Sequence, residues 1–210
     1  MEYRVYYKRK LPHFQPREGC FFITIRLAFA IPEKYLRAIV QYREILIRKH
    51  EQDIDQCKAK EMIKKLDFAY KDGIYDRCLH EVNLCDERVA KHIIEQLLAM
   101  HKIQYHMMAY TLMPNHLHLL IRPLENEHGT ICISDIVRIF KGISARVINK
   151  ELSRTGTLWF REYYDHWVRN QQELVNVIEY MRNNPVKAGL VKCPEDWQFG
   201  WVNDNFWEKE

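Results

Sequence analysis

Two short strand-like runs joined by a tight turn constrain the fold of this 210-residue chain more than any other feature. Residues 105–112 (YHMMAYTL) and 116–122 (HLHLLIR) are rich in aliphatic and aromatic side chains, and Met-Pro-Asn lies between them. Runs of this kind, bounded by proline and asparagine, are typical of strands and of the turns that connect them. The sequence therefore predicts a β-hairpin over residues 105–122.

The second run contains two histidines at alternate positions. In a strand, His116 and His118 leave one face of the sheet, whereas Leu117, Leu119 and Ile121 leave the other. Two imidazoles that emerge side by side can bind one divalent cation. Such an ion needs more than two ligands, so a third side chain and oxygens of a substrate would have to complete the set. A purely structural pair is the alternative.

Apolar patterning predicts the remaining elements of a mixed α and β fold. Aromatic and β-branched residues at 20–29 indicate a buried strand. Helical spacing predicts helices at 33–52 and about 86–101, another with Ser134 as its N-cap, and a last one at about 171–183 that Pro185 ends.

The length of the chain favours one domain over residues 1–210. A charged, helix-leaning stretch at about 53–84, with a turn near Asp72 and Gly73, is predicted to be an insertion on that domain. No apolar run approaches the roughly 20 residues of a membrane span, and the basic N-terminus lacks the apolar segment of a signal peptide. Six cysteines without a C-x-x-C pair favour neither a disulfide framework nor a zinc knuckle. We expect reduced thiols in a cytoplasmic protein.

Basic residues are concentrated in two zones, although the net charge of the chain is only +4. Residues 1–17 carry five basic side chains against one acid, and residues 138–192 carry ten against five. Such clustering suits a polyanion bound in one place. Ordinary solvated surface charge is the alternative.

The last predicted helix supplies two further candidates. Tyr180 and Asn184 are i, i+4 neighbours on the flank of its apolar stripe. A phenol has an ordinary pKa near 10, so nucleophilic use requires a nearby cation or base and an electrophile such as a metal-bound phosphodiester. An edge-packed aromatic ring is the alternative for Tyr180. The proline that follows Asn184 disfavours helical geometry at that asparagine.

Four segments, in this order, resemble the REP-associated tyrosine transposases, which are bacterial relatives of the HUH single-strand DNA transposases. The segments are MPNHLHLL, KGISARVIN, LWFREYYDHWVRN and YMRNNPVKAGLV, and the resemblance is strong from about residue 86 to 201. It implies an α+β fold of the HUH endonuclease type, with a ferredoxin-like or RRM-like antiparallel sheet and helices on one face. It also implies a metal-dependent endonuclease that nicks and rejoins single-stranded DNA, at hairpin or palindromic repeats such as REP elements.

The resemblance also implies roles for individual residues. His116, His118 and a third side chain would hold Mg²⁺ or Mn²⁺, and Tyr180 would attack the scissile phosphate to form a 5′-phosphotyrosine. Asn184 stands where the third ligand is expected, although many relatives outside this subgroup carry glutamine there. A hairpin-binding protein of the same fold that has lost transposition is the alternative function. An RRM-like RNA binder is not supported, because the aromatic signature of that module is not evident on the predicted strands of this chain. A hydrolase that uses water would leave Tyr180 dispensable.

Further residues are candidates for contact with single-stranded or hairpin DNA. Arg138 and Lys141 can contact phosphates, Tyr163 can stack on a base, and His166 and Lys187 complete the set. Surface charge and core packing are the alternatives for these side chains. Related transposases form dimers whereas the REP-associated branch is thought to act as single chains, so both a monomer and a homodimer stay open. We expect association with the bacterial nucleoid.

Overall fold

The computed structural model describes residues 6–8, 12–28, 33–51, 53, 55–75, 81–127 and 129–203. The chain divides into two compact units. One comprises Met1–Ala28 together with Val82–Glu210, and the other comprises Phe29–Glu81. The predicted hairpin and all the candidate site residues belong to the first unit.

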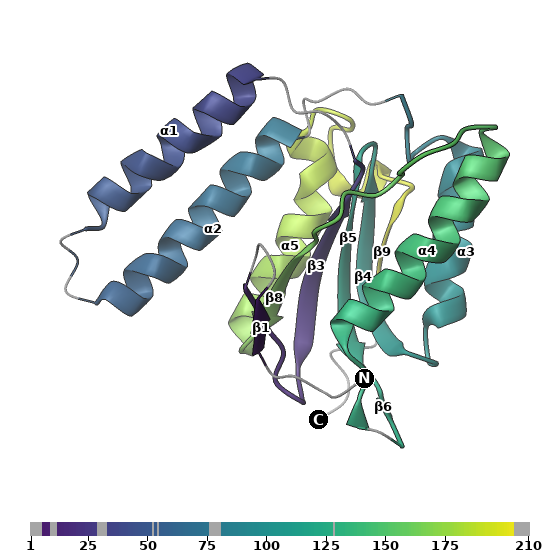
Figure 1. The fold of residues 1–210 in the computed structure, drawn as a ribbon, viewed down its shortest axis with the longest axis horizontal. Coiled ribbons are helices and arrows are strands. Elements are labelled where there is room, and N and C mark those ends of the chain that lie inside the picture. The colour runs from purple at the N-terminus through teal and green to yellow at the C-terminus, as the bar shows by residue number, and fades with distance from the viewer. Residues whose placement is uncertain are drawn as a thin grey trace. The chain divides into compact units, whose positions relative to one another are not determined.

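A five-stranded antiparallel sheet forms the centre of the first unit (Figure 1). Its strands are β3 (Cys20–Arg26), β4 (Tyr105–Met113), β5 (His116–Pro123), β8 (Tyr164–Val168) and β9 (Gly200–Val202). Their order in the sheet is β8-β3-β5-β4-β9, so β5 is the middle strand. The β-hairpin predicted over residues 105–122 is confirmed as the pair β4 and β5, with a register shift between Met107 and Ala109.

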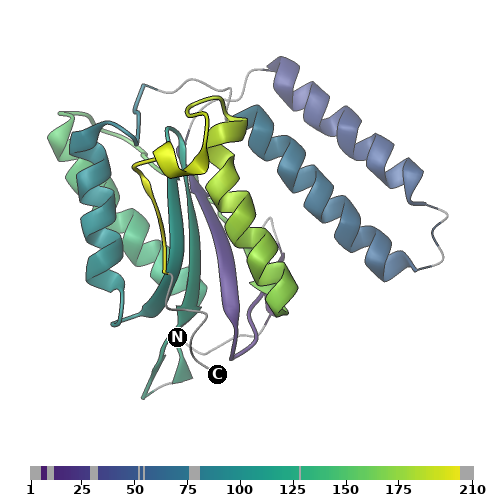
Figure 2. The ribbon, with the colours of Figure 1, turned by 180° about the vertical axis from the view of Figure 1, so that it is seen from behind.

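Three helices cover the two faces of this sheet (Figures 1 and 2). Helices α3 (Glu87–Met100) and α4 (Ile133–Glu151) pack together on one face, and α5 (Gln171–Lys187) lies on the other. With α3 between β3 and β4 and α4 between β5 and β8, the strand order β8-β3-β5-β4 is that of a ferredoxin-like βαββαβ unit. The predicted α+β class and antiparallel sheet are confirmed, and the expected helices on one face are α3 and α4. Helix α5 adds a layer to the opposite face.

The start of α4 differs from the prediction. The helix begins at Ile133 and its N-cap residue is Cys132, whose side chain makes no capping hydrogen bond. Ser134 therefore lies inside the helix. The buried side chain of Gln15 supplies the missing acceptor, because its Oε1 accepts from the Ile133 N–H at 2.8 Å while its Nε2 donates to the Ile131 carbonyl at 3.0 Å. Gln15, more than a hundred residues away in the sequence, thus accepts the hydrogen bond that an N-cap side chain usually accepts.

Short elements complete the first unit. Strands β1 (Tyr6–Lys8) and β2 (Pro12–Phe14) form one two-stranded ladder, and β6 (Glu125–Asn126) and β7 (Gly129–Thr130) form another. The 3₁₀ helix η1 spans Pro194–Asp196. None of the helices in the described part of the chain combines the length and apolarity that crossing a membrane requires.

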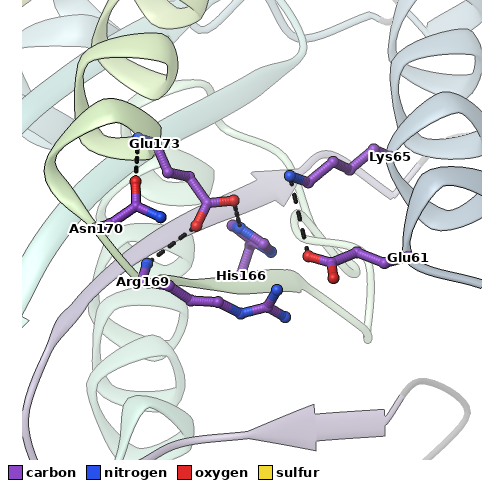
Figure 3. Close-up of polar contacts among 6 residues, drawn as sticks. All are labelled: Glu61, Lys65, His166, Arg169, Asn170 and Glu173. Atoms are coloured by element: carbon purple, nitrogen blue, oxygen red, sulfur yellow. Dashed lines mark hydrogen bonds and ion pairs between the residues drawn. The ribbon is translucent and has the colours of Figure 1, made fainter. Parts of the chain in front are cut away.

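The second unit is a pair of helices, α1 (Glu33–Lys49) and α2 (Gln56–Tyr75). The rings of Tyr42 and Tyr70 stack with centroids 4.0 Å apart, and an ion pair joins Glu61 to Lys65 one turn along α2 (Figure 3). The unit includes the helix predicted at 33–52 as well as most of the insertion expected at 53–84. The turn predicted near Gly73 is wrong, since α2 continues through this residue to Tyr75. That the whole chain is one domain stays a prediction.

Candidate functional site

The two histidines of β5 lie under α5 on the face of the sheet opposite the leucines. His118 is paired with Thr24 of β3 and Thr111 of β4, and residues directly opposite one another in a ladder share a face. The exposed fractions of His116 and His118 are only 2% and 0%. The predicted common face is confirmed, but α5 covers it, so both imidazoles are part of the packed interior.

Each ring nitrogen of the pair is in contact with the other imidazole or with an uncharged side-chain oxygen. The two Nε2 atoms are 3.0 Å apart. His116 Nδ1 lies 2.8 Å from Asn115 Oδ1, and His118 Nδ1 lies 2.9 Å from Thr24 Oγ1. A neutral imidazole carries one N–H and one lone pair, so the short contact between the Nε2 atoms needs a proton on one of them.

This arrangement fits a divalent cation. If each Nδ1 carries the proton and donates it to its oxygen partner, both Nε2 lone pairs face the same point, which is the usual orientation of metal-binding histidines. The two Nε2 atoms are 3.0 Å apart, so both could bind the same ion. Among the residues described, no three His, Cys, Asp or Glu side chains gather closely enough to hold an ion by themselves.

Helix α5 brings the other two candidates to the pair. Asn184 is 3% exposed, and its Nδ2 lies 3.3 Å from His118 Nε2. A half-turn of the amide exchanges its nitrogen and oxygen, which would direct an oxygen ligand to the same point. Tyr180 is half-buried, with its ring centroid 5.5 Å from that of His118 and 5.9 Å from that of Phe22. The structure thus brings His116, His118, Tyr180 and Asn184 together, with Asn184 on the buried stripe rather than on its flank.

Pro185 does not end the last helix, contrary to the prediction. Helix α5 continues to Lys187, with the proline inside it. The proline removes the N–H that would bind the carbonyl of Met181. The buried hydroxyl of Thr111 donates to that carbonyl at 3.1 Å, so the helix continues without an unsatisfied group at this position.

The structure assigns internal contacts to several of the predicted DNA-binding residues. Arg138 is exposed and pairs with Asp135 on its own helix. The Lys141 ammonium donates to the carbonyls of residues 160–162 at 2.9 to 3.4 Å, so it holds a loop. Tyr163 is only 5% exposed, and its ring is therefore not free to stack on a base in this conformation. The Lys187 ammonium lies 5.3 Å from the centre of the Tyr180 ring.

His166 belongs to a polar cluster at the start of α5 (Figure 3). Its Nε2 lies 2.9 Å from Glu173 Oε1, and the other carboxylate oxygen accepts from the backbone N–H of Arg169 at 3.0 Å. Asn170 is the N-cap, and its Oδ1 accepts from the Glu173 N–H at 2.9 Å. This reciprocal arrangement resembles a capping box, so His166 helps to fix the N-terminus of α5.

Three residues that contact the site were missed in the sequence. Thr24 and Asn115 hydrogen-bond the imidazoles, and Thr111 bonds the backbone of α5. The alternation of side chains between the two faces of each strand could have identified them. Thr24 is a polar residue between two buried isoleucines of β3, so it had to face the side opposite to them, where the histidines lie.

Comparisons with known proteins agree with the resemblance seen in the sequence. A model of the protein family described as "Transposase IS200 like" matches residues 78–184, just over half of the chain. A Haemophilus influenzae protein named as a REP-associated tyrosine transposase is 30% identical over 97 residues, which cover 43% of this chain and 55% of that protein. An uncharacterized protein of the same organism is 29% identical over 96 residues, covering 37% and 52%. The chain therefore spans about half the length of these curated relatives.

A solved structure of the REP-associated tyrosine transposase bound to a REP hairpin also aligns with this chain. The alignment covers 99% of this chain and 84% of that one, at 18% sequence identity and a TM-score of 0.47. The family model and the named relative together confirm the resemblance predicted from the four segments.

Proposed function

The chain belongs to the IS200-like transposase family, and on that premise we propose that it is a metal-dependent endonuclease and strand transferase of single-stranded DNA. Its targets are hairpin or palindromic repeats, and Tyr180 is its nucleophile. One observation carries the proposal: the Nε2 atoms of His116 and His118 face each other at 3.0 Å under the turn of α5 that holds Tyr180 and Asn184.

His116, His118 and the amide oxygen of Asn184 would hold Mg²⁺ or Mn²⁺. When bound there, the ion supplies positive charge that polarises a phosphodiester and orients it. Asn115 and Thr24 can accept the Nδ1 protons, so both imidazoles would take the tautomer that offers Nε2 when the ion binds. The burial of the pair excludes bulk water, which strengthens electrostatic interactions with a phosphate.

Tyr180 carries the covalent step. Its phenolic oxygen attacks phosphorus and loses its proton, the bond between phosphorus and the 3′ oxygen breaks, and that oxygen leaves as a free 3′ hydroxyl. The product is a 5′-phosphotyrosine. Attack by another 3′ hydroxyl on this linkage restores the phenol and rejoins DNA, so strand transfer needs no external energy source. The Lys187 ammonium near the Tyr180 ring would place positive charge beside the reacting phosphate.

The test is the capture of the covalent product. The native chain and Tyr180→Phe would each be incubated with Mn²⁺ and a labelled pool of hairpin oligonucleotides that have randomised loops and single-stranded flanks. A denaturing gel should show a labelled adduct with the native chain and none with the variant, and chelation of the metal should abolish it. Hairpin binding by both proteins should agree within a few-fold, because the ring that packs against His118 and Phe22 is retained.

Other outcomes would identify other functions. Binding of hairpin DNA without any adduct would favour the hairpin-binding protein of the same fold that has lost transposition. Cleavage by the phenylalanine variant would show that a water molecule, rather than Tyr180, is the nucleophile. The number of chains that act together and the association with the nucleoid remain predictions from the sequence.

A further inference from the structure

One cross-strand row of side chains connects the histidine site to α5. Thr24, His118 and Thr111 lie opposite one another on β3, β5 and β4, and all three are buried. The Thr24 hydroxyl bonds the His118 ring at 2.9 Å. The Thr111 hydroxyl bonds the main chain of α5 at the Met181 carbonyl, 3.1 Å away. Thr24 therefore fixes the imidazole on the sheet, and Thr111 fixes the helix above it.

The Met181 carbonyl is available to Thr111 because of Pro185. In an α-helix the N–H of residue i binds the carbonyl of residue i−4, so residue 185 would normally occupy the carbonyl of residue 181. A proline has no N–H, and its ring pushes the i−4 carbonyl aside. A buried carbonyl without a donor costs free energy, and the Thr111 hydroxyl supplies the donor from the sheet. A helix–sheet bond thus takes the place of a bond within the helix.

This bond acts on the turn of α5 that holds the candidate site residues. Met181 directly follows Tyr180 and precedes Asn184 by three residues, so its carbonyl lies within the same turn as both side chains. Thr111, which binds this carbonyl, lies directly opposite His118 on the neighbouring strand β5. The hydrogen bond from Thr111 therefore fixes, beside His118, both the rotation of α5 about its axis and its position along β5.

We propose that Thr111 is a positioning residue: its hydroxyl replaces the helix hydrogen bond that Pro185 eliminates, and so sets Tyr180 and Asn184 relative to His118. The effect on cleavage rests on the proposed function, whereas the effect on the geometry of α5 does not. A misplacement of about 1 Å in a reacting group can lower a rate about 100-fold. Loss of this hydroxyl should accordingly affect the chemical step more than the binding of DNA.

The test uses Thr111→Val, which keeps the shape and removes the hydroxyl, and Pro185→Ala, which restores the missing N–H. Thr111→Ser retains the donor. Thr130→Val is a matched control, because Thr130 is also buried and its hydroxyl also binds a main-chain carbonyl, that of Arg17, at 2.9 Å. The structural readout is the nuclear Overhauser effect between the rings of His118 and Tyr180, whose centroids lie 5.5 Å apart. The functional readouts are the rate of adduct formation at saturating hairpin DNA and the affinity for that DNA.

With Thr111→Val we expect a weaker ring-to-ring signal and an adduct-forming rate lower by about tenfold to 100-fold. The affinity for DNA should change by less than about threefold. Thr111→Ser should resemble the native chain. The decisive variant is the double one, T111V/P185A, which should recover the signal and the rate to within about threefold of P185A alone, because the restored N–H occupies the Met181 carbonyl. T130V should show neither effect.

An equal loss from T111V with and without P185A would overturn the proposal, as would a native signal and rate in T111V alone. If T111V fails to fold and the double variant folds, the coupling is confirmed; if neither folds, the hydroxyl has another role and the proposal is wrong. Absence of any adduct from the native chain would contradict the proposed function, and the ring-to-ring signal would still decide the role of Thr111.

Discussion

Replacement of Thr24 by valine tests whether the Thr24 hydroxyl supports metal binding by the histidine pair. Thr24 Oγ1 is 2.9 Å from His118 Nδ1, and both residues are buried. A hydroxyl can either donate to this nitrogen or accept from it. Valine has nearly the same shape and can do neither, so Thr24→Val removes the hydrogen-bond partner of His118 Nδ1 while leaving the packing of β3 intact.

The expected loss of metal affinity follows from the tautomer of His118 that metal binding requires. Metal binding through Nε2 requires the proton on Nδ1, and in the variant that N–H would be buried against a methyl group. A buried donor without a partner costs about 1–3 kcal/mol, and loss of outer hydrogen bonds to metal-binding histidines typically lowers metal affinity about 10–100-fold. We therefore expect the dissociation constant for Mn²⁺ to rise about 10–100-fold in Thr24→Val. Thr24→Ser, which keeps the hydroxyl, should bind Mn²⁺ like the native chain.

The assay is Mn²⁺ titration followed by electron paramagnetic resonance of the free ion, with and without a hairpin oligonucleotide. ¹⁵N spectra of the histidine side chains report the tautomers of the metal-free protein. The reasoning would be refuted by a Thr24→Val variant that is folded and binds Mn²⁺ with unchanged affinity in both conditions. The contact to Thr24 would then be structural only.

Three other perturbations have defined outcomes. Asn184→Ala should raise the Mn²⁺ concentration needed for cleavage more than it lowers the rate at saturation, since it removes one ligand; normal cleavage at every metal concentration would exclude Asn184 as a ligand. Asn170→Ala removes the N-cap of α5 and should lower the free energy of unfolding by about 1 kcal/mol in a denaturant titration, whereas Gln172→Ala in the same turn should stay within about 0.5 kcal/mol. Burial raises the pKa of the Cys85 thiol from its ordinary value near 9 to about 12, so the folded chain keeps a proton that the unfolded chain loses, and stability falls as the pH rises above about 9. Between pH 7.5 and 10.5 the native chain should lose about 2 kcal/mol relative to Cys85→Ala, and a difference independent of pH would contradict this.

Local patterns predicted the parts of the site that depend on one element at a time. The alternation in residues 116–122 placed His116 and His118 on one face, and the ladder with β3 and β4 confirms this. Helical spacing located α5 and put Tyr180 and Asn184 within one turn of each other. These features depend on backbone periodicity, which the sequence displays directly.

The features that were wrong or missed depend on partners distant in the chain. Pro185 continues a helix because a hydroxyl 74 positions earlier, on Thr111, binds the carbonyl that the proline leaves open. The contact of the Lys141 ammonium with carbonyls of the loop at 160–162 was missed, and its predicted contact with phosphate stays a prediction. The N-cap predicted at Ser134 is displaced because Gln15 supplies the acceptor. Each of these contacts is tertiary, and local periodicity does not encode it.

The chemistry of the proposed site links metal binding to DNA binding. Thr24, Asn115 and Asn184, which hydrogen-bond the two imidazoles, are all neutral, as are the imidazoles themselves in the metal-binding tautomer. A divalent charge in so buried a place is costly unless negative charge accompanies it. The phosphate of the substrate would bring that charge, so each ligand should raise the affinity for the other, and by linkage the two factors must be equal. The neutral ligand set therefore favours a cation that is bound firmly only when a phosphodiester is in place, which would confine the activated site to molecules that already hold DNA.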